Sequence, residues 1–156
     1  MEQIASFQID HTLLQPGLYL SRQDGDIATY DLRFCRPNTQ PLLSQVELHS
    51  VEHLLATVLR NSSYGPAVVY FGPMGCQTGF YLLLRGLSQQ QAIDCLQQAL
   101  QQSLAYQGGM PGCSPKECGN YRTLDLAQAK QAIAAYAQTI AGWTPQQLAY
   151  PHSAAC

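Results

Sequence analysis

Three side chains suited to metal and proton chemistry lie close together in the sequence, at His49, Glu52 and His53. On a helix, positions i, i+3 and i+4 share one face, so the two imidazoles and the carboxylate would converge. Imidazole nitrogens one turn apart can bind a first-row metal ion. The order H-x-x-E-H inverts the H-E-x-x-H signature and is itself a metal motif. The alternative is a solvated cluster on an amphipathic helix, and we favour metal binding because two of the four histidines occupy this turn.

Two imidazoles do not complete a catalytic metal site, which usually has three protein ligands and one open position. The residue types that could supply the third ligand occur at Cys76, Cys113, Glu117 and Cys118. Cys113 and Cys118 are spaced as in a zinc knuckle, although no second pair completes that motif. The sequence pattern therefore predicts a metal site and leaves its third ligand open.

A second chemical group is the thiol of Cys76, which lies in the loop 72–79. Three glycines and one proline in this loop can bend the backbone and present the thiol rather than bury it. His11 is ambiguous, because an isolated histidine is more often a structural residue than a catalytic one. Asp31 and Arg33 leave the core side of a predicted strand together. They form either a solvent-facing strand edge or the polar wall of a pocket.

The elements that must position these groups follow from hydrophobic patterning. Ser44 with Glu47, and Ser88 with Gln91, match the capping box that begins a helix. Strands are expected over 17–22, 27–34, 67–71 and 80–85, and helices after 44, 88 and 125, with a short one after 144. This order predicts a small α/β (α+β) two-layer fold, with a mainly antiparallel sheet packed against about three helices. We expect one domain over 1–156, with a flexible tail over roughly 150–156.

The composition restricts the classes of partner. A chain of 156 residues with a formal net charge of −2 and no Lys/Arg run does not fit nucleic acid or an anionic membrane as main partner. A small uncharged or zwitterionic substrate fits better. There is no apolar run of the ~20 residues that span a bilayer, and no signal peptide pattern, so we expect a cytoplasmic protein. In that compartment the six cysteines are expected to be free thiols or metal ligands.

Four sequence blocks, taken together, resemble the S-ribosylhomocysteine lyases, the bacterial autoinducer-2 production proteins. The blocks are H-x-x-E-H-L-L-A at 49–56, G-P-M-G-C-Q-T-G-F-Y at 72–81, Y-D-L-R-F at 30–34 and C-G-N-Y at 118–121. The resemblance covers residues 6 to roughly 130, and the loop beside the histidine motif is its most specific part. Three positions depart from the family's usual residues, namely Arg36, Tyr70 and Leu124.

The resemblance assigns roles to eight residues. The implied metal ligands are His49, His53 and Cys118. The implied acid/base residues are Glu52 and Cys76. The implied substrate-binding residues are Ser6, His11 and Arg33. One divalent metal per chain is implied, natively Fe(II), with zinc or cobalt able to substitute.

The resemblance also implies a reaction and an assembly. The family moves the sugar carbonyl of S-ribosylhomocysteine and then eliminates its thioether, giving homocysteine and 4,5-dihydroxypentane-2,3-dione. Its members are homodimers with sites at the interface, where the N-terminal segment of one chain reaches the metal site of the other. Two alternatives remain. One is an inverted-motif metallopeptidase, with Glu52 activating water and Glu117 as a carboxylate ligand. The other is a non-catalytic metal-binding module, which predicts a closed site with four ligands.

Overall fold

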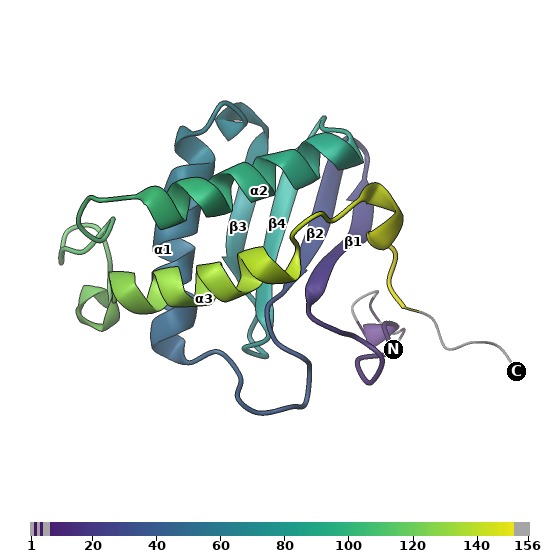
Figure 1. Ribbon diagram of the computed structural model, residues 1–156, viewed down its shortest axis with the longest axis horizontal. Coiled ribbons are helices and arrows are strands. Elements are labelled where there is room, and N and C mark those ends of the chain that lie inside the picture. Colours follow the sequence, from purple (N-terminus) through teal and green to yellow (C-terminus); the bar gives the residue numbers. More distant parts are fainter. Residues whose placement is uncertain (1, 3, 5–6, 152–156) are drawn as a thin grey trace, which may run out of the picture.

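A computed structural model describes residues 2, 4 and 7–151 of the chain. The predicted substrate residue Ser6, and residues 152–156 of the predicted tail, lie outside the described residues. Four antiparallel strands form one sheet in the order β1-β2-β4-β3. Helices α2 and α3 cross one face of this sheet, and α1 runs beside β3 (Figure 1). The predicted two-layer α+β fold is confirmed.

The strand boundaries are close to those expected. The four strands are β1 (Gly17–Asp24), β2 (Ile27–Arg33), β3 (Val68–Pro73) and β4 (Gly79–Arg85). A turn with a left-handed glycine, Gly25 at φ 60°, joins β1 to β2. On β4, Phe80, Leu82 and Leu84 are buried towards the helices, while the alternate Tyr81 and Leu83 are half-buried on the opposite face. The period of two therefore gives the sheet one face for the core and one for other contacts.

Helices α1 (Gln45–Asn61) and α2 (Gln89–Ala105) both begin at the predicted capping boxes. The hydroxyls of Ser44 and Ser88 each accept a hydrogen bond from the backbone amide of the third helical residue. The side chain of that third residue accepts a hydrogen bond from the serine amide in return. Helix α3 (Leu126–Thr139) begins at Asp125, whose carboxylate accepts the Gln128 amide. Each cap satisfies backbone donors that the first helical turn leaves without partners.

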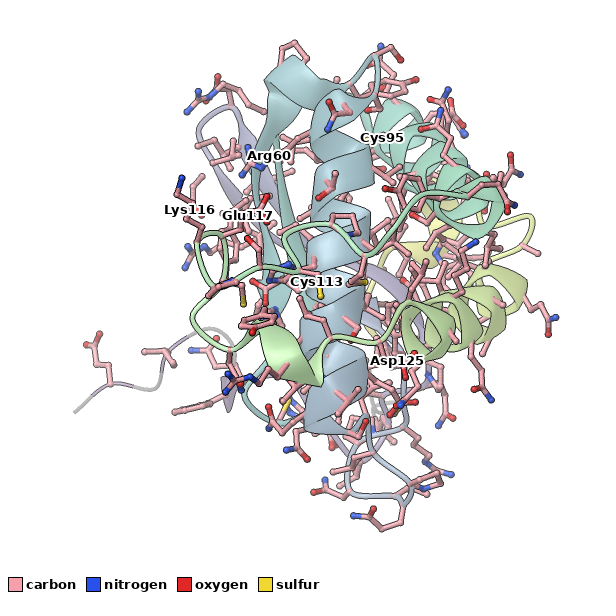
Figure 2. All side chains as sticks on the ribbon, turned by 90° about the vertical axis from the view of Figure 1, so that its left-hand side faces the viewer. Arg60, Cys95, Cys113, Lys116, Glu117 and Asp125 are labelled. Carbon is pink, nitrogen blue, oxygen red and sulfur yellow. The ribbon has the colours of Figure 1, made fainter. Side chains whose placement is uncertain are left out.

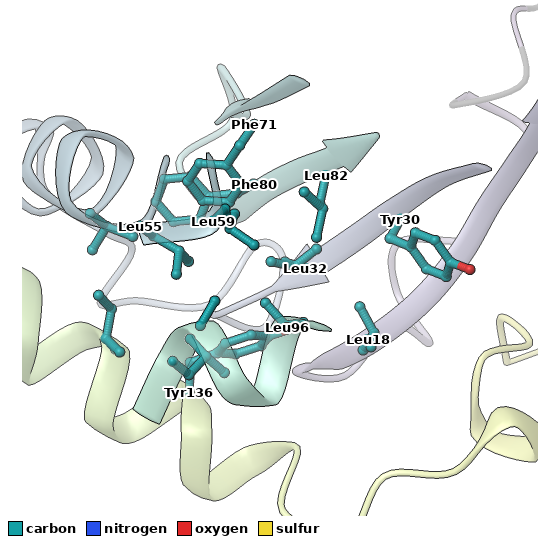
Figure 3. Packing of buried hydrophobic residues seen from close by; sticks show 14 of the residues in the cluster. Leu18, Tyr30, Leu32, Leu55, Leu59, Phe71, Phe80, Leu82, Leu96 and Tyr136 are labelled. Atoms are coloured by element: carbon teal, nitrogen blue, oxygen red, sulfur yellow. The ribbon is translucent and has the colours of Figure 1, made fainter. Parts of the chain in front are cut away.

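The core lies between the sheet and the three helices, as Figure 3 shows for part of it. Its fully buried members include residues from every layer, namely Leu32, Leu54, Leu55, Leu59, Phe80, Ile93, Ala129 and Ile133. Phe80 stacks on Phe71 at 5.1 Å between ring centroids. This packing fixes α1 against β3, and so fixes the direction in which the histidines of α1 point.

Asp31 and Arg33 are almost completely buried, with 0% and 2% of their surface exposed. The alternative of a solvent-facing strand edge is therefore wrong. Strand β2 is an inner strand, paired with β1 and β4, and side chains from distant segments contact the two residues: Tyr150 contacts Asp31, and Thr78 contacts Arg33. Their side chains contribute to a buried polar network at the end of β2.

The C-terminal segment returns to the sheet. A single 3-10 turn covers Pro145–Gln147, and the next residue, Leu148, accepts a hydrogen bond from the Leu20 amide on β1 at 2.8 Å. Tyr150, within the predicted tail, donates its hydroxyl to Asp31 at 2.8 Å and stacks on Tyr19. Order therefore extends at least to Tyr150. Among the described residues, none of the helices has the length and apolar character required to cross a membrane.

Candidate metal centre and thiol group

Helix α1 places the H-x-x-E-H side chains on one partly exposed face, as the helical spacing predicts. The rings of His49 and His53 meet edge to face, with centroids 4.7 Å apart. Glu52 shares a hollow of about 380 Å³ with His49. Leu54 and Leu55, on the opposite side of the helix, are fully buried and hold this face outward.

Of the four candidates for the third ligand, Cys118 is the one that lies beside the two histidines. Its sulfur lies 3.3 Å from Nε2 of His49, and one donor atom from each of His49, His53 and Cys118 lies within 4.8 Å of the others. We call these three residues the metal group. A turn in which the Ser114 carbonyl accepts the Glu117 and Cys118 amides brings the thiol to α1. Figure 2 shows this loop against the helix.

The other candidate ligands point elsewhere. The carboxylate of Glu117 accepts a hydrogen bond from the Ser114 hydroxyl at 2.5 Å. The thiol of Cys113 is exposed and lies 3.8 Å from the Tyr121 carbonyl. Cys76 lines a separate hollow. The five cysteines in the described part of the chain are all free thiols, as expected.

Two hydrogen bonds fix the tautomers of the histidines. Nδ1 of His53 lies 2.9 Å from the Pro111 carbonyl, which can only accept, so this nitrogen carries the proton. The Thr123 hydroxyl donates to the Asn120 carbonyl at 3.1 Å and so accepts from Nδ1 of His49, also at 3.1 Å. Both Nε2 atoms are thereby left unprotonated, and that of His49 faces the Cys118 sulfur. Such outer partners orient metal-binding histidines, and the donor set fits a divalent ion.

Burial and the charge of His53 lower the pKa of His49. The neutral imidazole that binds metals is therefore favoured. Gly112 makes the close approach of the loop possible, since a Cβ there would lie 2.7 Å from Nδ1 of His53 and its φ is +66°. Sequence reasoning missed Thr123, Pro111 and Gly112. Nothing in their spacing could have identified them, because they act over 58 to 74 residues of separation.

The thiol group consists of Arg33, Cys76 and Thr78. Nη1 of Arg33 donates to the Thr78 hydroxyl at 2.5 Å and lies 3.9 Å from the Cys76 sulfur, and the hydroxyl and sulfur are 3.0 Å apart. The other guanidinium nitrogens donate to Asp31 at 3.1 and 2.5 Å. Burial of Arg33 opposes its charge, but Asp31 outweighs this and raises the pKa of Arg33 overall. A fixed positive charge thus faces the thiol.

The loop between β3 and β4 carries Cys76 to this position. Its last glycine, Gly79, pairs with Arg33, and a Cβ there would lie 2.0 Å from the Leu32 carbonyl oxygen. Only glycine permits this contact between the two backbones. The Gln77 carbonyl accepts the Leu43 amide at 3.0 Å, which ties the loop to the segment before α1. The expectation that this loop presents its thiol agrees with the exposure of Cys76.

His11 and Cys76 line a second hollow of about 400 Å³, together with Asn38, Gln40 and Thr78. Nδ1 of His11 lies 2.8 Å from the Ile9 carbonyl. The hollow beside the metal group includes Gly75, whereas the second one includes the adjacent Cys76. Within one chain, His49 and Glu52 thus line one hollow, and His11 and Cys76 line the other.

Comparison with known proteins gives a consistent result. The S-ribosylhomocysteinase (LuxS) family model matches residues 4–147. The S-ribosylhomocysteine lyase of Clostridium beijerinckii is 45% identical over 159 positions, covering 97% of this chain and 100% of that protein. The lyases of Desulfotalea psychrophila and Borreliella afzelii are 43% and 40% identical, covering 97% of this chain and 99% and 100% of those proteins. The chain belongs to the S-ribosylhomocysteinase (LuxS) family.

Proposed function

We propose that this protein is a carbon–sulfur lyase that converts S-ribosylhomocysteine to homocysteine and 4,5-dihydroxypentane-2,3-dione, the precursor of autoinducer-2. The observation that carries the proposal is the approach of His49, His53 and Cys118 to within 4.8 Å in a chain matched by the family over residues 4–147. The open hollow beside Glu52 gives a substrate access to this group.

The proposed metal ligands are two imidazole nitrogens and one thiolate, which leave one position of a tetrahedral site open. A divalent ion bound there would act as a Lewis acid on a sugar oxygen. We propose Fe(II) as the native ion, with zinc or cobalt as substitutes, because these ligand types accept all three. Metal analysis of protein purified without oxygen, compared with protein purified in air, tests this assignment.

Glu52 and Cys76 are the proposed acid/base residues. Carbonyl migration needs a proton taken from one carbon and returned to its neighbour, which positioned side chains can do. Cys76, facing the cation of Arg33, would act as a thiolate base in the migration steps. Glu52, beside His49 in the first hollow, would move protons in the later shift and in the elimination that breaks the carbon–sulfur bond.

The second hollow suits the binding of a polar substrate. His11 lines it, and Arg33 stands behind Cys76 and Thr78 at its wall. We propose both as substrate-binding residues. Ser6 is proposed for the same role from the family resemblance alone, since it lies outside the described residues.

We propose that two copies of the chain form a homodimer that completes each site. His11 and Glu52 line different hollows of one chain, so neither hollow holds the whole set. The sheet face away from the helices carries a further hollow of about 470 Å³, lined by Ile4, Tyr81 and Leu83 among others. Tyr70 on that face is 49% exposed. A second copy on this face would bury these apolar groups and bring the N-terminal segment to the partner's metal group.

Release of free thiol from S-ribosylhomocysteine by metal-loaded protein tests the activity. We expect Cys76→Ala and Glu52→Gln each to lower the rate by about 100- to 10,000-fold. Both variants should retain the metal, because neither residue belongs to the metal group. Thr139→Val, which changes an exposed hydroxyl on α3, is the matched control and should keep full activity.

The same assay separates the two alternatives. Peptide cleavage without thiol release would favour a metallopeptidase, although Glu117 points away from the metal group. Metal binding with neither reaction would favour a non-catalytic module. Among the residues that the structure describes, the group has three potential ligands and an adjacent hollow rather than four in a closed site. This arrangement favours catalysis over a structural ion.

Mixed dimers test the shared site. His11→Ala and His53→Ala chains should each be nearly inactive alone. If His11 serves the partner's metal group, dimers containing one chain of each kind hold one intact site. Their activity should recover to about a quarter of the wild-type value in a random mixture, because half the dimers are mixed and each has one of two sites. No recovery on mixing would place His11 and the metal of one site in the same chain.

A further inference from the structure

The hydroxyl of Thr78 is buried between the guanidinium of Arg33 and the thiol of Cys76. Thr78 is 3% exposed, and its hydroxyl oxygen lies 2.5 Å from Nη1 of Arg33 and 3.0 Å from the Cys76 sulfur. The family resemblance and the matching relatives' names assign no role to this residue. Its position between the proposed base and a buried cation calls for a chemical explanation.

Counting donors and acceptors gives the direction of these bonds. A guanidinium has no acceptor, so Arg33 must donate to the Thr78 oxygen. The hydroxyl proton then needs an acceptor of its own. Within the described part of the chain, the Cys76 sulfur is the partner the structure gives it. If the sulfur donated instead, the buried hydroxyl proton would lack an acceptor, which is costly.

We infer that Thr78 is a positioning residue that donates its hydroxyl to the Cys76 sulfur and so holds this side chain in its thiolate form, oriented towards the hollow. A thiolate accepts hydrogen bonds and a thiol only weakly does so, and the bond therefore favours the charged form. Arg33 strengthens the effect twice, by its charge and by polarising the hydroxyl. The inference rests on the proposed function insofar as Cys76 is the catalytic base.

Other ionisable groups also act on the thiol. Asp31 neutralises much of the Arg33 charge from the same strand. Tyr81 on β4 is close enough to interact electrostatically with Cys76, and His11 lines the same hollow. These groups are unchanged when the Thr78 side chain alone is altered, so a Thr78 variant isolates the hydroxyl.

The backbone of Thr78 has a separate structural task. Its carbonyl accepts the amides of Phe34 and Cys35 at 2.9 and 3.0 Å, which fixes the loop to the end of β2. A side-chain substitution leaves these bonds in place. Thr78→Val keeps the branched shape and removes the hydroxyl, whereas Thr78→Ser keeps the hydroxyl. The two variants therefore separate hydrogen bonding from packing.

The test is the rate of iodoacetamide alkylation of Cys76 against pH, followed by mass spectrometry of its peptide in metal-loaded full-length protein. The alkylation midpoint is the pH at which the rate reaches half its maximum. In Thr78→Val this midpoint should move to higher pH by about one unit, which makes alkylation below the midpoint about tenfold slower. Thr78→Ser should restore the wild-type profile to within about twofold. Thr139→Val and the exposed thiol of Cys113 are the controls and should not change.

The outcomes are distinct. A midpoint in Thr78→Val equal to that of wild type overturns the inference, as does failure of Thr78→Ser to restore it. Alkylation does not use the lyase reaction, so a midpoint shifted in Thr78→Val upholds the hydrogen bond even if wild-type protein releases no thiol from S-ribosylhomocysteine, a result that would reject the proposed function alone. Normal thiol release by wild-type protein, together with an unshifted midpoint in Thr78→Val, upholds the proposed function and rejects the role of Thr78.

Discussion

The metal group and the thiol group are built in opposite ways. The metal group joins a helix to a loop, its three residues are partly exposed, and their donor atoms point at one another. The thiol group joins the last residue of β2 to the loop between β3 and β4, and its Arg33 is 2% exposed with a buried counterion and a hydroxyl partner. One group needs an ion to hold three lone pairs together. The polar atoms of the thiol group already have partners within the protein. A substitution in one group should therefore leave the other group unchanged.

The largest expected effect is on the metal group. Cys118→Ala removes the only sulfur within that group, so we expect loss of the bound metal and a fall in lyase rate of at least about 1,000-fold. The thiol group should be unaffected because it shares no hydrogen bond with Cys118. Metal content by mass spectrometry, with the alkylation profile of Cys76, measures both. A changed Cys76 profile would mean that the two groups are coupled.

A smaller but general effect is expected from the thiol group. Asp31→Asn leaves the buried Arg33 without its counterion, and we expect the free energy of unfolding to fall by about 3 kcal/mol or more. Urea unfolding monitored by circular dichroism measures the change. Metal affinity, measured on the folded variant, should stay within about twofold of wild type. If Asp31→Asn lost metal affinity but kept its free energy of unfolding, the proposed independence of the two groups would be wrong.

The smallest effect concerns Tyr150 and pH. Burial and the charge of Asp31 raise the pKa of Tyr150, so the folded protein keeps the phenolic proton above pH ~10, where the unfolded chain loses it. The unfolded state then binds fewer protons, and the free energy of unfolding falls as pH rises above ~10. Tyr150→Phe should cost about 1 kcal/mol at pH 7.

The alkaline slope gives the check on that prediction. In Tyr150→Phe the fall in stability above pH ~10 should be shallower than in wild type. Some slope should remain, because burial raises the pKa of Tyr136 as well. Urea midpoints at several pH values provide the comparison. An unchanged slope would indicate that Tyr150 is ionised equally in both states.

The parts of the structure that local chemistry determines could be predicted from the sequence. The caps at Ser44 and Ser88, the face shared by His49 and His53, and the period of two along β4 depend on neighbours within a few residues. The resemblance to known lyases then indicated Cys118, which spacing alone had left among four candidates.

The rest depends on contacts between distant segments. Asp31 and Arg33 lie on an inner strand and are contacted by Tyr150 and Thr78, and neither the strand order nor these contacts can be obtained from the strand's own residues. Thr123 and Pro111 orient the histidines across 58 to 74 residues. Tyr150 follows the segment matched by the family, which ends at residue 147, and no motif marked it as a partner of Asp31.

The absence of a side chain at Gly75 has a consequence for inhibitor design. A Cβ built at this position meets no atom within 4 Å, so the protein itself has room for a methyl group there. Gly75 borders one hollow and the next residue borders the other. Gly75→Ala would raise a small barrier on the rim between them. Compounds that bridge both hollows should lose potency against this variant, and compounds confined to either hollow should keep it.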